Sequence, residues 1–437
     1  MHKLEIKLKQ HTPLIHFQHD QEGATLRASE VKPKLDKYLT KYAFHDNFDE
    51  CKEYLVGYDS NLKKTKELKE KWNNGYRALN YKISIVSSRK ECKKFYIKRD
   101  SYGKPVSNDN GAPKTDTVPL YFGNLKKEES LVYDGSEDIK LNFFSLYDGI
   151  IKKIRENYLD FFATTNFGTR QSKGFGSFYP SDTILDKKMF GQYYYFTTTA
   201  NGDDWWHQAL DLFTKIDFFY KSLRSGINQG FYFKSLIFHY AIDQKQYYDK
   251  RKIRQFYEHF KPNKEYDKGE KDEKSKKRPW TEELSGKSRL YRDMLGLSTS
   301  QDWMFYNAKM SKESSIQDKE KKINRFKSPL TFKPLYLNAN TVIVLVIPSE
   351  IPKAYLNHSF NITSKWNGKN KGFIGVKEGE MLPMSTPEQF NIVDFLSYVF
   401  KGEGRTIALE QLNKQKNSIA NKLTKIYNNM HYPQIQQ

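Results

Sequence analysis

The sequence predicts an α+β protein built from two lobes. Three observations favour this fold class: a length of 437 residues, helical and strand patterns that interleave in both halves, and no repeat of short period. A chain of this length suits two domains of about 200 residues each. We therefore expect a first lobe over residues 1–202 and a second lobe over residues 203–437.

The first lobe opens with a strand and a helix. Residues 4–9 alternate apolar and charged side chains, as a strand with one solvated face does. Ser29 is placed to cap a helix that begins at Glu30, where Pro33 is tolerated if it falls in the first turn. The patterns then predict a charged helix, two strands, an amphipathic helix and a further strand, over residues 63–71, 81–87, 141–144, 146–162 and 190–199. A stretch rich in Gly, Pro, Asn and Ser, residues 101–116, predicts an exposed loop.

The second lobe begins with two predicted long helices, residues 205–223 and 230–242. Residues 244–280 carry mixed charge without apolar periodicity, which predicts an exposed or partly disordered linker. The remaining expected elements are a pair of strands and two closing helices, over residues 328–337, 341–347, 390–400 and 407–428.

The charge of the chain indicates a polyanionic partner. It has 73 Lys and Arg against 52 Asp and Glu, a formal net charge of +21. A compact chain this basic repels itself, so nucleic acid is the first candidate partner and an anionic membrane surface the second. A lysine-rich surface that is simply solvated is the alternative. The 30 Tyr and 30 Phe are expected mostly in the core, but rings near the surface would stack on unpaired bases. Basic and aromatic residues side by side favour RNA over a membrane.

The sequence lacks the signals of several other classes of protein. Cys51 and Cys92 are the two cysteines and have no CxxC spacing, which argues against a structural zinc site and against a secreted disulfide framework. The N-terminal residues contain no apolar leader, and the longest aliphatic run, residues 341–347, is too short to span a bilayer. We expect a soluble, cytoplasmic protein without a cofactor or a metal ion.

The most informative segment is a glycine-rich loop, residues 167–178 (FGTRQSKGFGSF). Gly168, Gly174 and Gly176 allow positive φ and a close approach of the backbone to a ligand. Arg170 and Lys173 supply cations beside exposed amides that suit phosphate oxygens. The loop follows a predicted helix and lacks the spacing of an NTPase phosphate loop or of a dinucleotide fingerprint. A tight turn with incidental charge is the competing interpretation.

A second basic segment surrounds the predicted helix start at Ser29. Arg27, Lys32 and Lys34 lie near it, and the N-terminal end of a helix favours anions. The alternative is a helix that Ser29 merely caps, with lysines that are merely solvated.

Two more basic segments lie in the second half. Lys221 and Arg224 end a predicted helix just before Gly226, which suits a helix C-terminus. Residues 325–335 alternate cations with apolar residues, and their prolines exclude a central strand, so they form an edge strand or a loop. The cations of this stretch are Arg325, Lys327 and Lys333. An ordinary edge strand protected by lysines is the competing interpretation.

Four of these segments, in this order, resemble one protein family. They are Thr12-Pro13-Leu14, residues 26–32 (LRASEVK), residues 167–178 and residues 325–334. Together they resemble the RAMP superfamily of CRISPR proteins, and specifically the two-lobed first subunit of the type III-B Cmr complex. The motifs are short and degenerate and are scattered over residues 12–334.

The resemblance implies two ferredoxin-like (RRM-type) lobes with helical insertions, the glycine-rich loop ending the first lobe. It implies an RNA-binding structural subunit for antiviral defence, placed at the end of the backbone filament near the 3′ region of the guide RNA. Its partners would be guide RNA, target RNA and other CRISPR effector subunits in a hetero-oligomeric assembly. That subunit is not the nuclease of its complex.

Roles carry over to the residues that match the motifs. At the first helix start these are Arg27, Ser29 and Lys32. In the loop and the later segment they are Gly168, Arg170, Lys173, Gly174, Gly176, Arg325, Lys327 and Lys333. The sequence departs from the family pattern at residues 15–19, where a glycine pair is expected, and at residues 35–39, where an aromatic-rich helix is expected. These departures bear on the first helix and the subtype.

Two other functions stay open. One is a metal-independent RAMP endoribonuclease that processes guide precursors; it would need a general acid and base, and His11, His16 and His19 lie close to Lys9 and Asp20. The other is a basic scaffold that contacts partner proteins and touches RNA only incidentally.

Overall fold

The structure, a computed structural model, describes residues 1–15, 26–87, 89–95, 106, 131–137, 139–228, 230–256, 287–303, 308–316, 321–366 and 380–433. The chain divides into two compact units. Unit 1 comprises Met1–Asp217, Thr331–Ile347 and Pro433–Gln437, and unit 2 comprises Phe218–Leu330 and Pro348–Tyr432.

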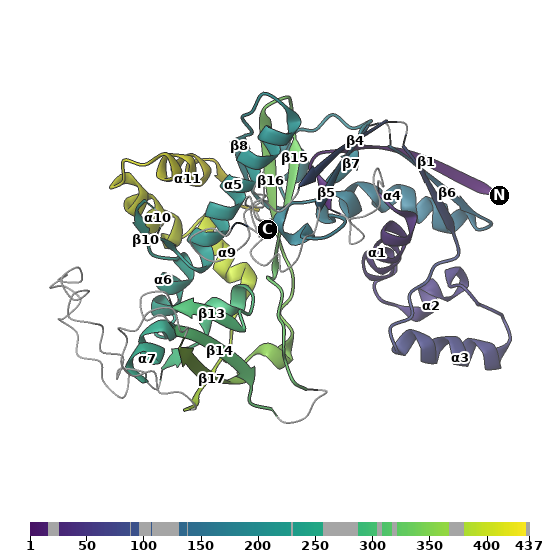
Figure 1. The fold of residues 1–437 in the computed structure, drawn as a ribbon. Helices are drawn as coiled ribbons and strands as arrows, with labels where there is room; N and C mark the ends of the chain where they lie inside the picture. The colour runs from purple at the N-terminus through teal and green to yellow at the C-terminus, as the bar shows by residue number, and fades with distance from the viewer. Residues whose placement is uncertain are drawn as a thin grey trace. The chain divides into compact units, whose positions relative to one another are not determined.

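An antiparallel four-stranded sheet forms the centre of unit 1, with the strand order β3-β6-β1-β7 (Figure 1). Its strands and the two helices packed on it follow along the chain as β-α-β-β-α-β. They are β1 (His2–Gln10), α1 (Ala28–Tyr42), β3 (Lys82–Val86), β6 (Ile139–Ser145), α4 (Asp148–Thr164) and β7 (Phe178–Pro180).

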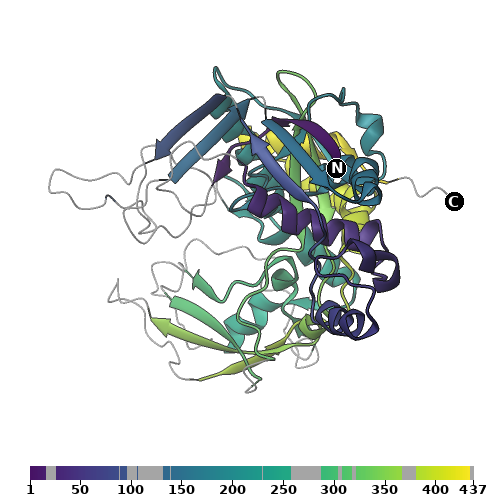
Figure 2. The ribbon, with the colours of Figure 1, turned by 90° about the vertical axis from the view of Figure 1, so that its right-hand side faces the viewer.

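The core of unit 1 lies between this sheet and the two helices (Figure 1, Figure 2). Along β1 the side chains alternate, with Ile6 and Leu8 buried and the charged residues between them exposed. This period of two is the one that the sequence predicts for residues 4–9. Along α4 the apolar side chains recur at helical spacing instead, and Ile150, Ile154 and Phe161 are buried. Removal of these faces from water stabilises the pairing of sheet and helices.

Further elements of unit 1 follow the same chain. Helices α2 (Phe48–Cys51) and α3 (Leu62–Asn73) lie between α1 and β3 in the sequence. A second sheet has the order β2-β5-β4, with β2 (Leu14–Ile15), β4 (Arg89–Phe95) and β5 (Leu131–Glu137). In a third, β16 (Thr341–Pro348) pairs with both β8 (Tyr194–Thr199) and β15 (Leu330–Tyr336), and β15 stands at one end of the order. The predictions of a strand pair here, and of an edge position for the proline-containing strand, are confirmed.

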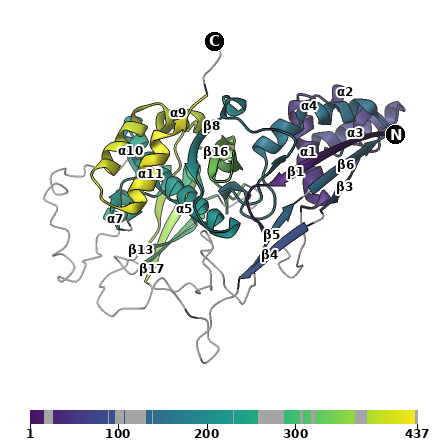
Figure 3. The same ribbon diagram turned by 90° about the horizontal axis from the view of Figure 1, so that it is seen from above.

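Unit 2 contains an antiparallel sheet with the order β13-β14-β17-β18 and several helices; α5 (Trp205–Arg224) runs from unit 1 into unit 2. In Figure 3 the helices α9, α10 and α11 lie together. The helices of this unit are α6 (Leu236–Asp243), α7 (Asp249–Phe256), α9 (Ile392–Phe400), α10 (Glu403–Asn413) and α11 (Ser418–Asn428). Its strands are β9 (Ile227–Asn228), β10 (Tyr232–Phe233), β11 (Tyr247–Tyr248), β12 (Ser288–Arg289), β13 (Ser300–Trp303), β14 (Ala308–Ser314), β17 (Ser359–Trp366), β18 (Leu382–Ser385) and β19 (Met430–His431).

The predicted α+β class is confirmed, and two of the helix predictions are wrong. Residues 230–242 are not one long helix, because the chain turns at Gly226 (φ +76°) into the paired strands β9 and β10 before α6 begins. Residues 407–428 form parts of two helices, because the side chain of Asn417 caps a new helix by accepting from Ile419 N at 2.8 Å.

The charged segment 244–280 is also more ordered than predicted where it is described. Residues 247–256 form β11 and α7, in which Asp249 and Ile253 are buried. Residues 257–280 lie outside the described residues, as does the predicted loop 101–116 apart from Val106.

Candidate nucleic-acid interface

The candidate interface in unit 1 is built around the glycine-rich loop between α4 and β7. Gly168, Gly174 and Gly176 have φ of +77°, +94° and +66°, so the predicted left-handed backbone is confirmed at all three. The close approach that these glycines permit is to the protein itself. A Cβ atom on Gly176 would lie 1.9 Å from the carbonyl oxygen of Phe167, and one on Gly168 would lie 2.6 Å from that of Ile15. The glycines therefore fold the loop tightly onto its own surroundings.

Thr12 and Pro13 hold the loop from one side. The Oγ1 atom of Thr12 donates to the carbonyl of Gly174 at 2.6 Å and accepts from the backbone N–H of Ser177 at 2.9 Å. The carbonyl of Pro13 accepts from the N–H of Gly176 at 2.8 Å. These buried hydrogen bonds satisfy backbone groups that would otherwise be left unpaired.

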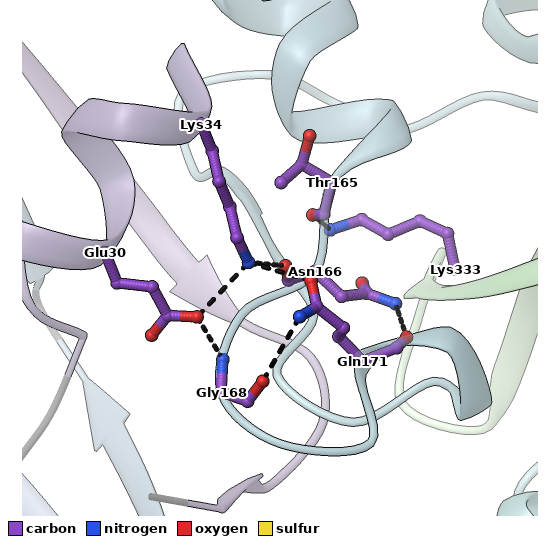
Figure 4. Close-up of polar contacts among 7 residues, drawn as sticks. All are labelled: Glu30, Lys34, Thr165, Asn166, Gly168, Gln171 and Lys333. Atoms are coloured by element: carbon purple, nitrogen blue, oxygen red, sulfur yellow. Dashed lines mark hydrogen bonds and ion pairs between the residues drawn. The ribbon is translucent and has the colours of Figure 1, made fainter. Parts of the chain in front are cut away.

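The first turn of α1 holds the loop from another side (Figure 4). The carboxylate of Glu30 accepts from the N–H of Gly168. Lys34 Nζ donates to Glu30 Oε1 at 3.2 Å, to the carbonyl of Asn166 at 2.8 Å and to Gln171 Oε1 at 2.8 Å. A carboxylate in the first turn also suits the positive end of the helix dipole. The anion expected at this helix start is thus partly supplied by the protein, and Lys34 is engaged in holding the loop.

Lys333, on β15, holds both ends of the loop from a third side. Its Nζ donates to the carbonyls of Thr165 and Phe178, each at 2.8 Å, and the residue is fully buried. Thr165 ends α4, where helix carbonyls favour a cation. Burial, with the positive charge of Lys34 adding to it, holds the pKa of Lys333 well below its usual range. The structure therefore gives Lys333 a place different from the predicted one: it has no surface on which to meet RNA.

The neighbours of Lys333 on β15 also hydrogen-bond to the two ends of the loop. Asn166 Nδ2 donates to the carbonyl of Phe332 at 2.8 Å, and Ser177 Oγ donates to the carbonyl of Pro334 at 2.6 Å. Asn166 and Ser177 also face each other as an antiparallel bridge that closes the loop. Three consecutive residues of β15, 332–334, thus hold the two ends of the glycine-rich loop.

Parts of all four segments that carry the family resemblance therefore meet at one place in unit 1. Thr12 and Pro13, Glu30, the loop and residues 332–334 are far apart in the sequence but share these hydrogen bonds. Each of these short motifs supplies groups that fix the conformation of the loop.

Arg170 and Lys173 lie on the loop and are half-buried. Arg170 precedes a single 3-10 turn, Gln171–Lys173, and has φ +54° and ψ 25°. A left-handed backbone costs a residue with a Cβ roughly 1–2 kcal/mol, and glycine adopts it without that cost. Lys245 has a similar positive φ of 55°, so the backbone conformation of Arg170 does not by itself assign a function to its side chain.

The predicted start of the first helix is wrong by two residues. α1 begins at Ala28, and Arg27 is the N-cap residue, whose carbonyl accepts from Glu30 N and Val31 N at 3.0 Å each. Ser29 lies exposed inside the first turn and makes no capping hydrogen bond, and Pro33 lies inside the helix rather than in its first turn.

Lys32 is engaged within unit 1. Its Nζ donates to Asp36 Oδ2 and to the carbonyl of Leu79, both at 2.8 Å, and lies 4.2 Å from the centre of the Tyr81 ring. Asp36 is buried, which raises its pKa, although the charge of Lys32 acts in the opposite direction. This pair fastens α1 to the segment before β3.

In unit 2 the end of α5 contacts the turn before β13. Arg224 Nη2 donates to the carbonyl of Gly296 at 2.7 Å, and Tyr220 Oη donates to that of Leu295. Lys221 lies half-buried with its Nζ 5.2 Å from the ring centre of Phe218. Gly226 donates its N–H to Lys221 O at 2.8 Å, which confirms the predicted helix end.

Arg325 and Lys327 are exposed on either side of an anchored ring. Phe326 stacks on Tyr355 with centroids 4.0 Å apart, and its carbonyl accepts from Leu297 N at 2.9 Å. A Cβ on Gly296 would lie 3.2 Å from Ser328 N, so this segment adjoins the turn that Arg224 contacts. Four predicted residues, Lys221, Arg224, Arg325 and Lys327, are thus brought into one region of unit 2.

The alternative of a catalytic histidine cluster finds little support at His11. This residue is buried, and its Nδ1 accepts from the N–H of Tyr336 at 2.9 Å. Burial, with the charges of Lys333 and Lys9, lowers the pKa of His11 well below its usual value. A ring held in this way is poorly placed to take a proton from a 2′-hydroxyl. His16 and His19 lie outside the described residues.

Within the described residues, no three His, Cys, Asp or Glu side chains gather in a way that could hold a metal ion. In the same part of the chain, no helix has the length and apolar character needed to cross a membrane.

Sequence reasoning missed the residues that fix the loop. Glu30, Asn166 and Gln171 bond the loop to α1 and to itself, and none was a candidate. A signal was present: Glu30 stands inside the LRASEVK motif and Asn166 directly precedes the loop.

Two family models match the chain: the Cmr1 N-terminal domain over residues 1–227 and the Cmr1 C-terminal domain over residues 232–425. Among solved structures the chain is similar to Cmr1 from Pyrococcus furiosus in its apo form, with 11% identity over 81% of this chain and 90% of that chain and a TM-score of 0.32. It is also similar to a chain of the type III-B Cmr-beta complex bound to cognate target RNA, with 10% identity over 85% of this chain and 96% of that chain and a TM-score of 0.33. A comparison with curated proteins gave no match. Because the two family models together span most of its length, the chain belongs to the Cmr1 family of type III-B CRISPR effector subunits, as its motifs predicted.

Proposed function

We propose that this chain is an RNA-binding, non-catalytic subunit of a type III-B effector complex, and that it holds guide RNA near its 3′ region, target RNA, or both. Its partners are then these RNAs and other Cmr subunits in a hetero-oligomeric assembly. The observation that carries the proposal is the convergence of four motif segments on one loop that bears Arg170 and Lys173. The net charge of +21 supports a polyanionic partner.

We further propose that both lobes are ferredoxin-like, with lobes over residues 1–202 and 203–437. The β-α-β-β-α-β succession and the order β3-β6-β1-β7 in unit 1 support this for the first lobe. For the second lobe, the support comes from β8 (194–199), just before residue 203, and from α5, β15 and β16, which follow it. In that sheet β16 lies between β15 and β8, which repeats the first part of the order in the first lobe.

The predicted RNA-contacting residues fall into two roles under this proposal. Direct contacts to RNA come from the residues that are half-buried or exposed: Arg27, Ser29, Arg170, Lys173, Lys221, Arg224, Arg325 and Lys327. The others shape the loop or the helix that present them: Lys32, Lys34, Gly168, Gly174, Gly176 and Lys333. Contacts of the first kind go mainly to phosphates, so sequence preference is weak.

The salt dependence of RNA affinity tests the loop's role. With about five phosphates neutralised, the slope of log K against log salt is about −3.5 for single-stranded RNA, a loss of ~100-fold for a roughly fourfold increase in salt. Arg170→Ala with Lys173→Ala flattens the slope by ~1.4, at ~0.7 for each of two phosphate contacts. The control pair Lys63→Ala with Lys66→Ala removes the same charge from the exposed surface of α3 and leaves the slope unchanged. An unchanged slope in the loop variant means that the loop does not contact the RNA backbone.

Sequencing the RNA that co-purifies with the tagged chain from its own cells tests the biological role. Uniform short RNAs that share a repeat-derived tag support the proposal, and Cmr subunits purify with them. Heterogeneous RNA, or none, contradicts it.

A further inference from the structure

The four-stranded sheet of unit 1 has a second face that the helices do not use. α1 and α4 lie against one face of the sheet (Figure 1). That face carries the buried Ile6 and Leu8, and the strands present a different set of side chains to the other side. The register of β1, β6 and β3 places nine residues of that side in three rows across the strands. The rows are Lys3, Phe144 and Lys82; Glu5, Asn142 and Ser84; and Lys7, Lys140 and Val86.

This open face is strongly basic. Its four lysines in the rows, and Lys9 further along β1, are all exposed. Against these five cations stands the carboxylate of Glu5, so the net charge is +4. Among the described residues, none of the five lysines is in an ion pair. Lys7 and Lys140 are direct cross-strand partners, an arrangement that destabilises an antiparallel pair unless an anion lies nearby.

Within the three rows, Phe144 is the aromatic residue among the cations. Phe144 is half-buried in the middle strand, flanked in its row by Lys3 and Lys82. Lys3 Nζ lies 5.8 Å from the ring centre. A ring of this kind, presented on a sheet between cations, suits an unpaired base that stacks while its phosphates meet the lysines. Duplex RNA offers no such base, and a protein partner would need an acidic surface that also tolerates the ring.

We propose that this face, centred on Phe144 with Lys3, Lys7, Lys82 and Lys140, is a second binding surface for single-stranded RNA. The inference rests on the proposed function in that RNA is the ligand, but it uses none of the residues of the glycine-rich loop. The loop follows α4 and is held by α1 and β15, whereas the face is formed by β1, β3 and β6. The two surfaces are therefore tested by separate substitutions.

The test measures the affinity of the full chain for a fluorescein-labelled 15-nucleotide uridine RNA at several salt concentrations. Phe144→Leu, which keeps an apolar side chain, weakens binding by about tenfold through the loss of one stacked base and leaves the salt slope unchanged. Lys7→Gln with Lys140→Gln flattens the slope by ~1.4, at ~0.7 per phosphate contact. Glu5→Gln strengthens binding, a gain that damage to the fold does not produce.

The outcomes separate this inference from the proposed function. If Arg170→Ala with Lys173→Ala weakens binding while the sheet variants bind as tightly as the wild-type chain, the face does not bind RNA and the loop proposal stands. If the sheet variants alone weaken binding, the face stands and the loop proposal fails. A third outcome overturns the inference. If Lys7→Gln with Lys140→Gln weakens binding to polyglutamate as much as binding to RNA, and Phe144→Leu changes neither, the face is a docking surface for an acidic protein. Should Phe144→Leu fail to fold, Glu5→Gln and the lysine pair still decide the question.

Discussion

Replacing Arg170 by glycine is expected to stabilise the protein and weaken its binding to RNA. Arg170 has φ +54° and ψ 25°, so the substitution releases roughly 1–2 kcal/mol of left-handed strain. Glycine also loses about 0.5–1 kcal/mol more conformational freedom on folding, which leaves a net gain of up to about 1 kcal/mol. For a domain of about 200 residues this raises the melting temperature by roughly 2–4 °C. The loss of one phosphate contact flattens the salt slope by ~0.7.

Lys245→Gly is the matched control for this experiment. Lys245 also has positive φ (55°) and is exposed, so its substitution removes the same charge and relieves the same kind of strain. It is expected to raise the melting temperature by a similar amount without a change in RNA affinity. The two observables are the thermal unfolding midpoint and the salt-dependent anisotropy of a labelled single-stranded RNA. A less stable Arg170→Gly protein with unaltered RNA binding would refute the reasoning, because Arg170 would then serve the fold alone.

Two further predictions concern stability. Gly176→Ala is expected to destabilise unit 1 by about 3 kcal/mol or more, because the new Cβ would stand 1.9 Å from the carbonyl of Phe167 and open the loop stem. The control is Gly57→Ala, because Gly57 has a positive φ of +87° and a new Cβ would meet no atom within 4 Å; it costs only about 1 kcal/mol. Equal shifts of the urea midpoint in the two variants would contradict the close contact between Gly176 and Phe167. The second prediction is a loss of stability as the pH falls from 7.5 to 5.5. The pKa of His11 is lowered in the folded chain, so below its unfolded value of about 6.5 the unfolded state binds the extra proton, and up to ~1.4 kcal/mol is lost per pH unit. His11→Asn, whose Oδ1 can still accept from Tyr336 N, is expected to have a shallower pH dependence of the urea midpoint, and an identical dependence would show that His11 titrates normally.

Features that depend on neighbouring residues were predictable from the sequence. The alternation in residues 4–9, the helical spacing in residues 146–162 and the glycines of the loop each report local backbone conformation, and the structure has the corresponding strand, helix and positive φ values. The charge of the whole chain is likewise independent of the fold, and it indicated a polyanionic partner before any element was placed.

Only the tertiary structure decided which cations have a free surface. Lys333 and Arg325 look alike in one extended basic segment, yet the first is fully buried between two carbonyls and the second is exposed. The bonds that bury Lys333 join it to residues 155 and 168 positions away, and no local pattern carries such a pairing. Phe144 and its flanking lysines come from three strands, so their common face exists only once the register of the sheet is set. Composition therefore indicates the kind of partner to expect, and long-range packing decides which side chains are left exposed to meet one, because the desolvation of each side chain depends on neighbours that the fold supplies.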